Sequence, residues 1–120
     1  MSLGFTQTPW GWFRTLEHGP TWQVKLLHVE AGRRTSLQRH AARSEWWYVL
    51  EGEGIVTIAE RTFPTGDTAW IHIYQGHQHR LTGVTPHGIT IIELQLSPLV
   101  GGIRESDITR LEDDYGRTDR

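Results

Sequence analysis

The stretch GRRTSLQRHAARSE, residues 32–45, and the later GHQH, residues 76–79, decide how this chain is interpreted. Together they offer one amide oxygen, two imidazoles and one carboxylate, at Gln38, His40, Glu45 and His79. Nitrogen and oxygen donors of this kind suit a divalent transition ion. The chain has no cysteine, so any metal must be held by nitrogen and oxygen atoms. If the fold brings these four side chains together, the protein is built around a metal.

The sequence around these stretches predicts short β-strands. Runs of β-branched, aromatic and apolar residues alternate with turns containing Gly or Pro about every ten residues, which is typical of a sandwich or barrel. No central segment keeps a helical period over three turns. Residues 106–111 fit either a short helix capped by Ser106 or a last strand. We expect one all-β domain, with turns at 52–54 and 64–67 and strands at 22–29, 45–50, 55–58, 68–71 and 89–96.

A barrel would bring the candidate ligands together. Residues i and i+2 of a strand share a face, so Gln38 and His40 point the same way. Glu45 begins the next predicted strand, and His79 must come from another strand. Inward positions of several strands converge inside a barrel. Each residue alone has an ordinary explanation, such as a solvated carboxylate or a loop imidazole, but their joint occurrence favours a metal site.

Length and composition limit the class of protein. The chain has 120 residues with a net charge of −2, which fits one domain at residues 9–120 after a polar N-terminus, residues 1–8, that we expect to be flexible. The charge gives no reason to expect nucleic acid or an anionic membrane as a partner, and no apolar run reaches the roughly 20 residues needed to cross a bilayer. Without a signal-peptide pattern, we expect a cytoplasmic protein.

Tryptophan is unusually abundant, with six in the chain. Packing in the core or in a dimer interface is the first explanation, and a platform for a sugar ring is the second. Trp46 and Trp47 are neighbours in a predicted strand, so they point to opposite faces. We therefore expect a homodimer, which is the commonest symmetric assembly.

The spacing of the key residues resembles a known superfamily. G-x5-Q-x-H-x4-E-x6-G over residues 32–52 is similar to the first cupin motif, with Gln38 in place of its first histidine. G-x5-H over 66–72 and G-x2-H over 76–79 are similar to the second motif. Within the cupins the chain resembles the type II phosphomannose isomerases, including the isomerase domains of bifunctional isomerase–guanylyltransferases. Further motifs support this resemblance: PWG at 9–11, SLQRH at 36–40, HRL at 79–81 and LEDDYGR at 111–117.

This resemblance implies a double-stranded β-helix, or jelly-roll barrel, with one divalent ion in its lumen. It assigns the ion to Gln38, His40, Glu45 and His79. Zinc is the first expectation, although Mn, Co, Ni and Fe accept the same donors. It also places Arg43 where the family has an arginine important for activity. The implied reaction converts mannose 6-phosphate to fructose 6-phosphate by moving a proton between C2 and C1, which a Lewis acid and a guanidinium can both assist.

Further side chains are candidates for contact with a sugar phosphate. Lys25, Arg34 and Arg80 are cations that can hold a phosphate, although each is more often a surface charge. Glu93 and Gln95 share one face of the strand at 89–96 and point either to solvent or to the lumen. The resembled family has matching residues here, which favours the lumen and makes Glu93 a candidate base for proton transfer.

The chain differs from the family at three positions. Ala41, Ala42 and Trp46 stand where histidines are common, which predicts that imidazoles titrating near neutral pH are missing. His72 and His77 are extra imidazoles that either compensate, ligate a metal in another register or lie on the surface. Two alternatives stay open: a different metal-dependent cupin enzyme, such as a dioxygenase or an isomerase of another sugar, and a non-catalytic carbohydrate-binding cupin.

Overall fold

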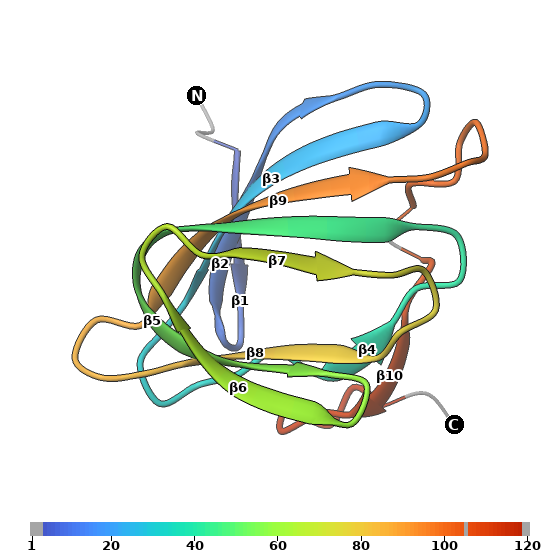
Figure 1. Ribbon diagram of the computed structural model, residues 1–120. Helices are drawn as coiled ribbons and strands as arrows, with labels where there is room; N and C mark the ends of the chain where they lie inside the picture. The colour runs from blue at the N-terminus through green and yellow to red at the C-terminus, as the bar shows by residue number, and fades with distance from the viewer. Residues whose placement is uncertain (1–3, 105, 119–120) are drawn as a thin grey trace.

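The chain forms an antiparallel sheet that curls around itself (Figure 1). The computed structural model describes residues 4–104 and 106–118, and within them the chain has strands and no helix. The strands are β1 (Phe5–Thr8), β2 (Gly11–His18), β3 (Trp22–Val29), β4 (Leu37–Arg39), β5 (Ser44–Ile58), β6 (Arg61–Gly66), β7 (Trp70–Ile73), β8 (His79–Gly83), β9 (Ile89–Leu96) and β10 (Thr109–Glu112). They pair in the order β1-β2-β3-β9-β5-β8-β4-β10, with β6 and β7 both on β5. The all-β prediction is confirmed.

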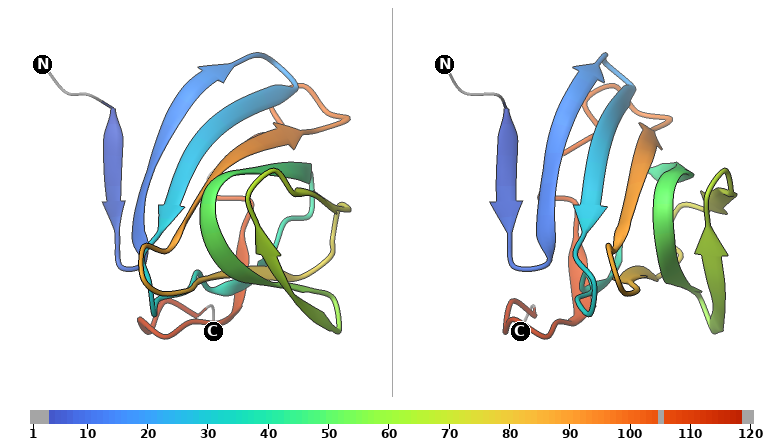
Figure 2. Two further views of the ribbon diagram at one scale, coloured as in Figure 1. Left: turned by 60° about the vertical axis from the view of Figure 1, so that its left-hand side comes forward. Right: turned by 90° about the vertical axis from the view of Figure 1, so that its left-hand side faces the viewer.

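Strand β5 connects the two halves of the barrel. Its first part pairs with β9 and β7, and its second part, from Glu53, pairs with β6 and β8. Figure 2 shows this green strand curving from one half to the other. The predicted turn at 52–54 is therefore wrong, and one strand replaces the two that we expected on either side of it. Gly52 is required for close backbone approach, because its φ is +93° and a Cβ there would lie 2.1 Å from the carbonyl oxygen of Gly88.

The other strand predictions differ in accuracy. The predicted strands at 22–29 and 89–96 coincide with β3 and β9. The turn predicted at 64–67 is displaced, because β6 continues through Pro64. Strand β6 has only β5 as a partner, and an edge strand tolerates a residue without a backbone N–H. Strand β7 accordingly begins two residues later than the predicted strand at 68–71.

Both ends of the described chain join the sheet. Residues 5–8, which we expected to be flexible, form β1 and pair with β2. Residues 1–3 of the expected N-terminal segment lie outside the described residues. At the other end, residues 109–112 form β10 against β4, so the strand alternative for this region is the observed one.

The inward side chains of three neighbouring strands change from apolar to polar along the barrel. In β9, Ile89 and Ile91 are buried at one end, whereas Glu93 and Gln95 are buried at the other. The strand register places Lys25 of β3 opposite Glu93 and aligns the polar ends of the strands. The apolar ends form the main part of a core that includes Leu27, Val29, Trp47, Val49, Val56, Ile71, Ile73, Leu81, Ile89 and Ile91. The barrel is therefore a hydrocarbon core at one end and a polar chamber at the other.

Candidate metal centre

Three of the predicted ligands meet in the polar half of the barrel. Nε2 of His40 lies 3.3 Å from Oε2 of Glu45, and Nε2 of His79 lies 3.7 Å from Oε1 of the same carboxylate. One ligand atom from each residue lies within 4.8 Å of the others, and all three residues are buried. Atoms that bind zinc at about 2.0–2.2 Å must lie this close together.

The two imidazoles are held in the tautomer that a metal requires. Nδ1 of His40 bonds to the carbonyl oxygen of Asp107, and Nδ1 of His79 bonds to the carbonyl oxygen of His77. A carbonyl oxygen only accepts, so each Nδ1 carries the proton and each neutral ring keeps a lone pair on Nε2. Nε2 of His79 is buried and has no hydrogen-bond partner among the described residues. A buried polar atom without a partner is costly, so this donor set fits a metal ion.

Gln38 is in position to complete the donor set. It lies in β4 directly opposite His79 of β8, and it lines the same cavity as His40. The hydroxyl of Ser36 donates to Oε1 of Gln38 at 3.2 Å, which orients the amide. Gln38 of β4 and His40, which directly follows β4, therefore line the cavity, and Glu45 of β5 and His79 of β8 lie against His40 and Gln38.

Burial and nearby charges keep His40 and Glu45 in their ligating forms at neutral pH. Burial lowers the pKa of His40 to about 4, with the charges of Arg43 and His79 adding to the effect. Burial alone would raise the pKa of Glu45, but His79, Arg43 and His40 together lower it to about 2. Neutral imidazole and ionised carboxylate are the forms that bind a metal.

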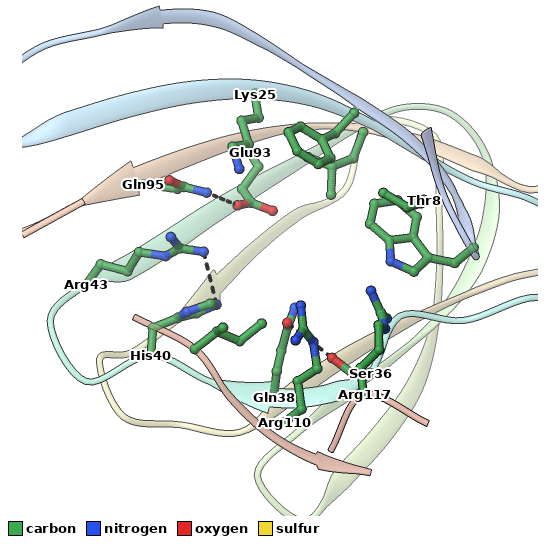
Figure 3. Close-up of a pocket in the computed structure, with 14 residues that line it drawn as sticks. Thr8, Lys25, Ser36, Gln38, His40, Arg43, Glu93, Gln95, Arg110 and Arg117 are labelled. Atoms are coloured by element: carbon green, nitrogen blue, oxygen red, sulfur yellow. Dashed lines mark hydrogen bonds between the residues drawn. The ribbon is translucent and has the colours of Figure 1, made fainter. Parts of the chain in front are cut away.

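Arg43 is bonded to the same atoms that would hold the ion. Its Nε and Nη2 lie 3.0 Å from Oε2 of Glu45, and its Nη2 lies 3.0 Å from Nε2 of His40 (Figure 3). The lone pair of His40 Nε2 can accept from the guanidinium or bind an ion, but not both. Arg43 and a divalent ion therefore compete for this atom.

Asp107 is a site residue that the sequence did not single out. Its carboxylate accepts the backbone N–H groups of Ala41 and Ala42 at 3.0 and 2.9 Å, and its carbonyl accepts from His40. These contacts fix the turn that carries His40 toward Glu45. The two amides lower the pKa of Asp107 against an opposing effect of burial. An aspartate far along the chain gave no sequence signal, because its role depends on backbone groups.

The chamber beside the cluster is a cavity of about 130 Å³. Pockets for drug-sized ligands are typically about 300 Å³ or larger, so this one suits a compact polar molecule. Glu93, Gln95 and Lys25 line it, as the lumen-facing alternative predicts (Figure 3). Nε2 of Gln95 donates to Oε1 of Glu93, and the amide of Gln23 donates to Gln95, so this carboxylate is held in place.

Glu93 is the buried carboxylate of this chamber that titrates near neutral pH. Burial raises its pKa to about 7, and the negative charge of Glu45 adds to the effect. Arg43 and Lys25 oppose the rise. Glu45 and Glu93 thus have pKa values far apart, which is the pattern of two carboxylates with different roles.

The structure does not bring Arg34 or Arg80 into the cavity. Arg34 is exposed and bonds to both carboxylate oxygens of Asp114 at 2.8 Å. Arg80 is buried, but its Nε donates to the carbonyl oxygen of Thr35 and its Nη1 lies 3.3 Å from Oε1 of Glu112. The cations that line the cavity besides Arg43 are Lys25, Arg110 and Arg117. Both C-terminal arginines are absent from the predicted site.

The tryptophan pair divides as expected. Trp47 is 3% exposed and donates from its Nε1 to Oε1 of Glu45, whereas Trp46 points to the outer surface. There Trp46 stacks on His72 with ring centroids 4.1 Å apart. The outer group, which we call the aromatic face, consists of Trp46, Tyr48, Trp70, His72, Tyr74 and His77. The side chains of the extra histidines thus lie on the outside of the barrel, although the backbone carbonyl of His77 bonds to His79 of the cluster.

Comparison with known proteins gives this site a family. A family model described as "Mannose-6-phosphate isomerase C-terminal" matches residues 5–113. The chain belongs to this mannose-6-phosphate isomerase C-terminal family. It is 39% identical over 110 residues to the alginate biosynthesis protein AlgA of Pseudomonas aeruginosa, covering 92% of this chain and 22% of that protein. It is 33% identical to the mannose-1-phosphate guanylyltransferase ManC of Salmonella typhimurium, covering 91% of this chain and 22% of that protein.

The chain spans about a fifth of the length of the relatives that it matches, so those relatives are longer proteins. Solved structures confirm the cupin fold. KdgF from a Halomonas species superposes with a TM-score of 0.74 at 13% identity, covering 85% of this chain and 88% of that one. The cupin domain of Schizosaccharomyces pombe Cnp3 superposes with a TM-score of 0.68 at 14% sequence identity, covering 72% of this chain and 64% of that one. Among the described residues, none forms a helix able to span a membrane.

Proposed function

We propose that this domain is a metal-dependent isomerase that interconverts mannose 6-phosphate and fructose 6-phosphate. The observation that carries the proposal is that the His40–Glu45–His79 cluster borders, through His40, a cavity that Arg43 and Glu93 also line. Membership in the isomerase C-terminal family supports the same reaction. The proposal concerns this domain, since the longer relatives contain much more chain.

An ion held by His40, Glu45, His79 and Gln38 would polarise the substrate carbonyl as a Lewis acid. Zinc is our first choice because imidazole and carboxylate are its usual partners when cysteine is absent. Non-haem iron oxygenases also use two histidines and one carboxylate, so the donors alone do not separate the two chemistries. The cations lining this cavity favour an anionic sugar as the substrate, whereas an oxygenase is expected to bind its substrate in a neutral, apolar pocket.

Glu93 is the proton-transfer group in this proposal. In the aldose-to-ketose direction, its ionised carboxylate takes the proton from C2, the C–H electron pair forms the C1–C2 double bond, and the carbonyl π electrons move onto O1 to give an enediolate. The same carboxyl group returns the proton to C1 while the proton of the C2 hydroxyl passes to O1, so that a carbonyl forms at C2 and the ketose is complete. A pKa of about 7 lets Glu93 act as both base and acid near neutral pH. Gln95 keeps the carboxylate in place through its hydrogen bond.

Arg43 stabilises negative charge in this proposal. Its guanidinium is permanently charged, is 6% exposed and lines the cavity. In such a water-poor site it can donate to the substrate oxygen that becomes negative as the enediol forms. Lys25 lies opposite Glu93 in the strand register and adds a second positive charge on that side.

The test is metal analysis followed by a coupled assay for fructose 6-phosphate. The purified domain should contain or accept one zinc per chain and turn over mannose 6-phosphate, and His40→Ala should lose both properties. A zinc-loaded domain that binds mannose 6-phosphate but exchanges no C2 proton with solvent would support a carbohydrate-binding role instead. Preferential binding of iron together with oxygen consumption would support an oxygenase.

We also propose that the aromatic face is where a second copy of the chain binds. Trp70 and Tyr74 are 67% and 62% exposed, and aromatic residues are enriched at protein interfaces. Trp70→Ser should convert a dimer to a monomer in analytical ultracentrifugation, while Leu99→Ser, at another exposed apolar position, should not. A wild type that sediments as a monomer at high concentration would refute the dimer.

A further inference from the structure

We propose that Arg110 and Arg117, which both come from the C-terminal segment, bind the phosphate group of the substrate. This inference rests on the proposed function for the choice of a sugar phosphate, and it names the part of the site that holds the anion. Neither the cupin motifs nor the predicted cations pointed to these residues. Both guanidinium-bearing side chains line the cavity, on the side of Ser36 and Gln38 (Figure 3).

Strand register places Arg110 in the chamber. Arg110 of β10 pairs directly with Gln38 of β4 in an antiparallel ladder. Directly paired residues project to the same side of a sheet, and Gln38 lines the cavity. The short strand β10 therefore serves to bring a positive charge next to a predicted metal ligand. Only a tertiary pairing of residues far apart in the sequence produces this arrangement.

Arg117 is held rigidly at the same end. Its Nε and Nη2 lie 2.8 and 3.0 Å from the two oxygens of Asp113, and its backbone N–H also donates to this carboxylate. The guanidinium lies 5.5 Å from the ring centre of Tyr115. A guanidinium has five N–H donors, and Asp113 uses two of them. Arg117 can therefore bind an anion without first losing much side-chain freedom.

The charges of the cavity match an anion. Its lining contains four cationic side chains, Lys25, Arg43, Arg110 and Arg117, and one carboxylate, Glu93, while the carboxylates of Glu45 and Asp113 pair with Arg43 and Arg117 from outside the lining. The whole chain has a net charge of −2, so this positive concentration is local. A cavity of one sign concentrates ligands of the other sign, and arginine binds phosphate by paired hydrogen bonds.

The two ends of the cavity also match the two ends of a hexose 6-phosphate. Arg43, His40 and Glu93 lie on one side of the chamber, whereas Arg110 and Arg117 lie on the other (Figure 3). In the sugar, the reacting carbons C1 and C2 lie at one end of the carbon chain and the phosphate at the other. With C2 near Glu93, the phosphate would point toward the side of the cavity that carries the C-terminal arginines.

The experiment compares binding of fructose 6-phosphate, fructose and inorganic phosphate to the full zinc-loaded chain by calorimetry. Arg110→Gln and Arg117→Gln should each weaken fructose 6-phosphate binding about tenfold or more and leave fructose binding unchanged. They should raise KM for mannose 6-phosphate more than they lower kcat. Arg34→Gln, whose arginine lies outside the cavity, is the matched control and should bind like the wild type. Thermal unfolding of each variant checks that it folds.

The outcomes separate this inference from the proposed function. Arginine-dependent phosphate binding without turnover would support the anion site and refute the isomerase. Normal turnover, with KM unchanged in both variants, would support the isomerase and refute the anion site. Equal loss in Arg34→Gln would also overturn the inference, because it would show a nonspecific charge effect.

Discussion

Replacing Arg43 with methionine should raise the affinity for zinc while lowering isomerase turnover. In the structure Nη2 of Arg43 lies 3.0 Å from the His40 Nε2 atom that would bind the ion, and both side chains are buried. A hydrogen bond that involves a charged group contributes about 1.5–3 kcal/mol. Zinc must displace this bond in the wild type but not in Arg43→Met. Since about 1.4 kcal/mol is a factor of ten, the dissociation constant should fall roughly ten- to hundredfold.

The assay is competition for zinc against a chromophoric chelator at pH 7, with turnover measured on the same samples. Arg34→Gln is the control, because Arg34 is exposed and bonded to Asp114, away from the cluster. Removing Arg43 also leaves Glu45 buried without its ion pair, so the metal-free variant should unfold at lower temperature and zinc should restore it. A weaker zinc affinity in Arg43→Met would refute the competition and would mean that Arg43 supports the metal site.

Four other predictions test the rest of the site and the fold. Asp107→Ala should weaken zinc binding about 10–100-fold in the same chelator assay, because the turn that carries His40 loses two hydrogen bonds. Wild-type kcat/KM should rise with pH up to about 7, where Glu93 ionises, and Glu93→Gln should lose this dependence along with most activity. The folded state binds the Glu93 proton more tightly than the unfolded state does. The free energy of unfolding in urea should therefore decrease as the pH is raised from about 4.5 to 7, and it should decrease less in Glu93→Gln. Gly52→Ala should cost about 1–3 kcal/mol in urea unfolding, more than Gly101→Ala, which has a similar φ but open space around its Cβ.

The sequence predicted the strands whose hydrophobic pattern is contained within the strand itself. It did not predict strand β5, which changes pairing partners along its length. Strands β3 and β9 are unbroken apolar or alternating runs, so their bounds were predictable. The glycines at 52 and 54 look like a hairpin turn, but β5 passes through them while moving from one half of the barrel to the other. Whether a glycine serves a turn or a close approach depends on the neighbouring strand, and Gly88 comes from a distant part of the chain.

The sequence predicted the metal cluster but did not predict two of the cations around it. His40, Glu45 and His79 have donor chemistry that few other roles require together, so type and spacing were informative. These two cations that line the cavity were not predictable in this way, because a surface arginine and a cavity arginine look identical in a sequence. Arg34 and Arg80 pair with acids near the C-terminus, whereas Arg110 and Arg117 line the cavity. Their roles depend on how the C-terminal segment pairs with β4.

The absence of histidine at positions 41, 42 and 46 is weaker evidence against catalysis than the sequence alone indicated. Ala41 is exposed and Ala42 half-buried, and neither lines the cavity. Both contribute to the site through backbone N–H groups, which every residue except proline possesses. Trp46 points to the outer face of β5, so a histidine there would reach His72 rather than a substrate in the chamber. In the proposed function, the acid–base group needed near neutral pH is Glu93, which lines the cavity and has a pKa raised to about 7 by burial. Restoring histidine at positions 41, 42 and 46 should therefore leave kcat unchanged, and a large gain in kcat would show that the chemistry lies outside this chamber.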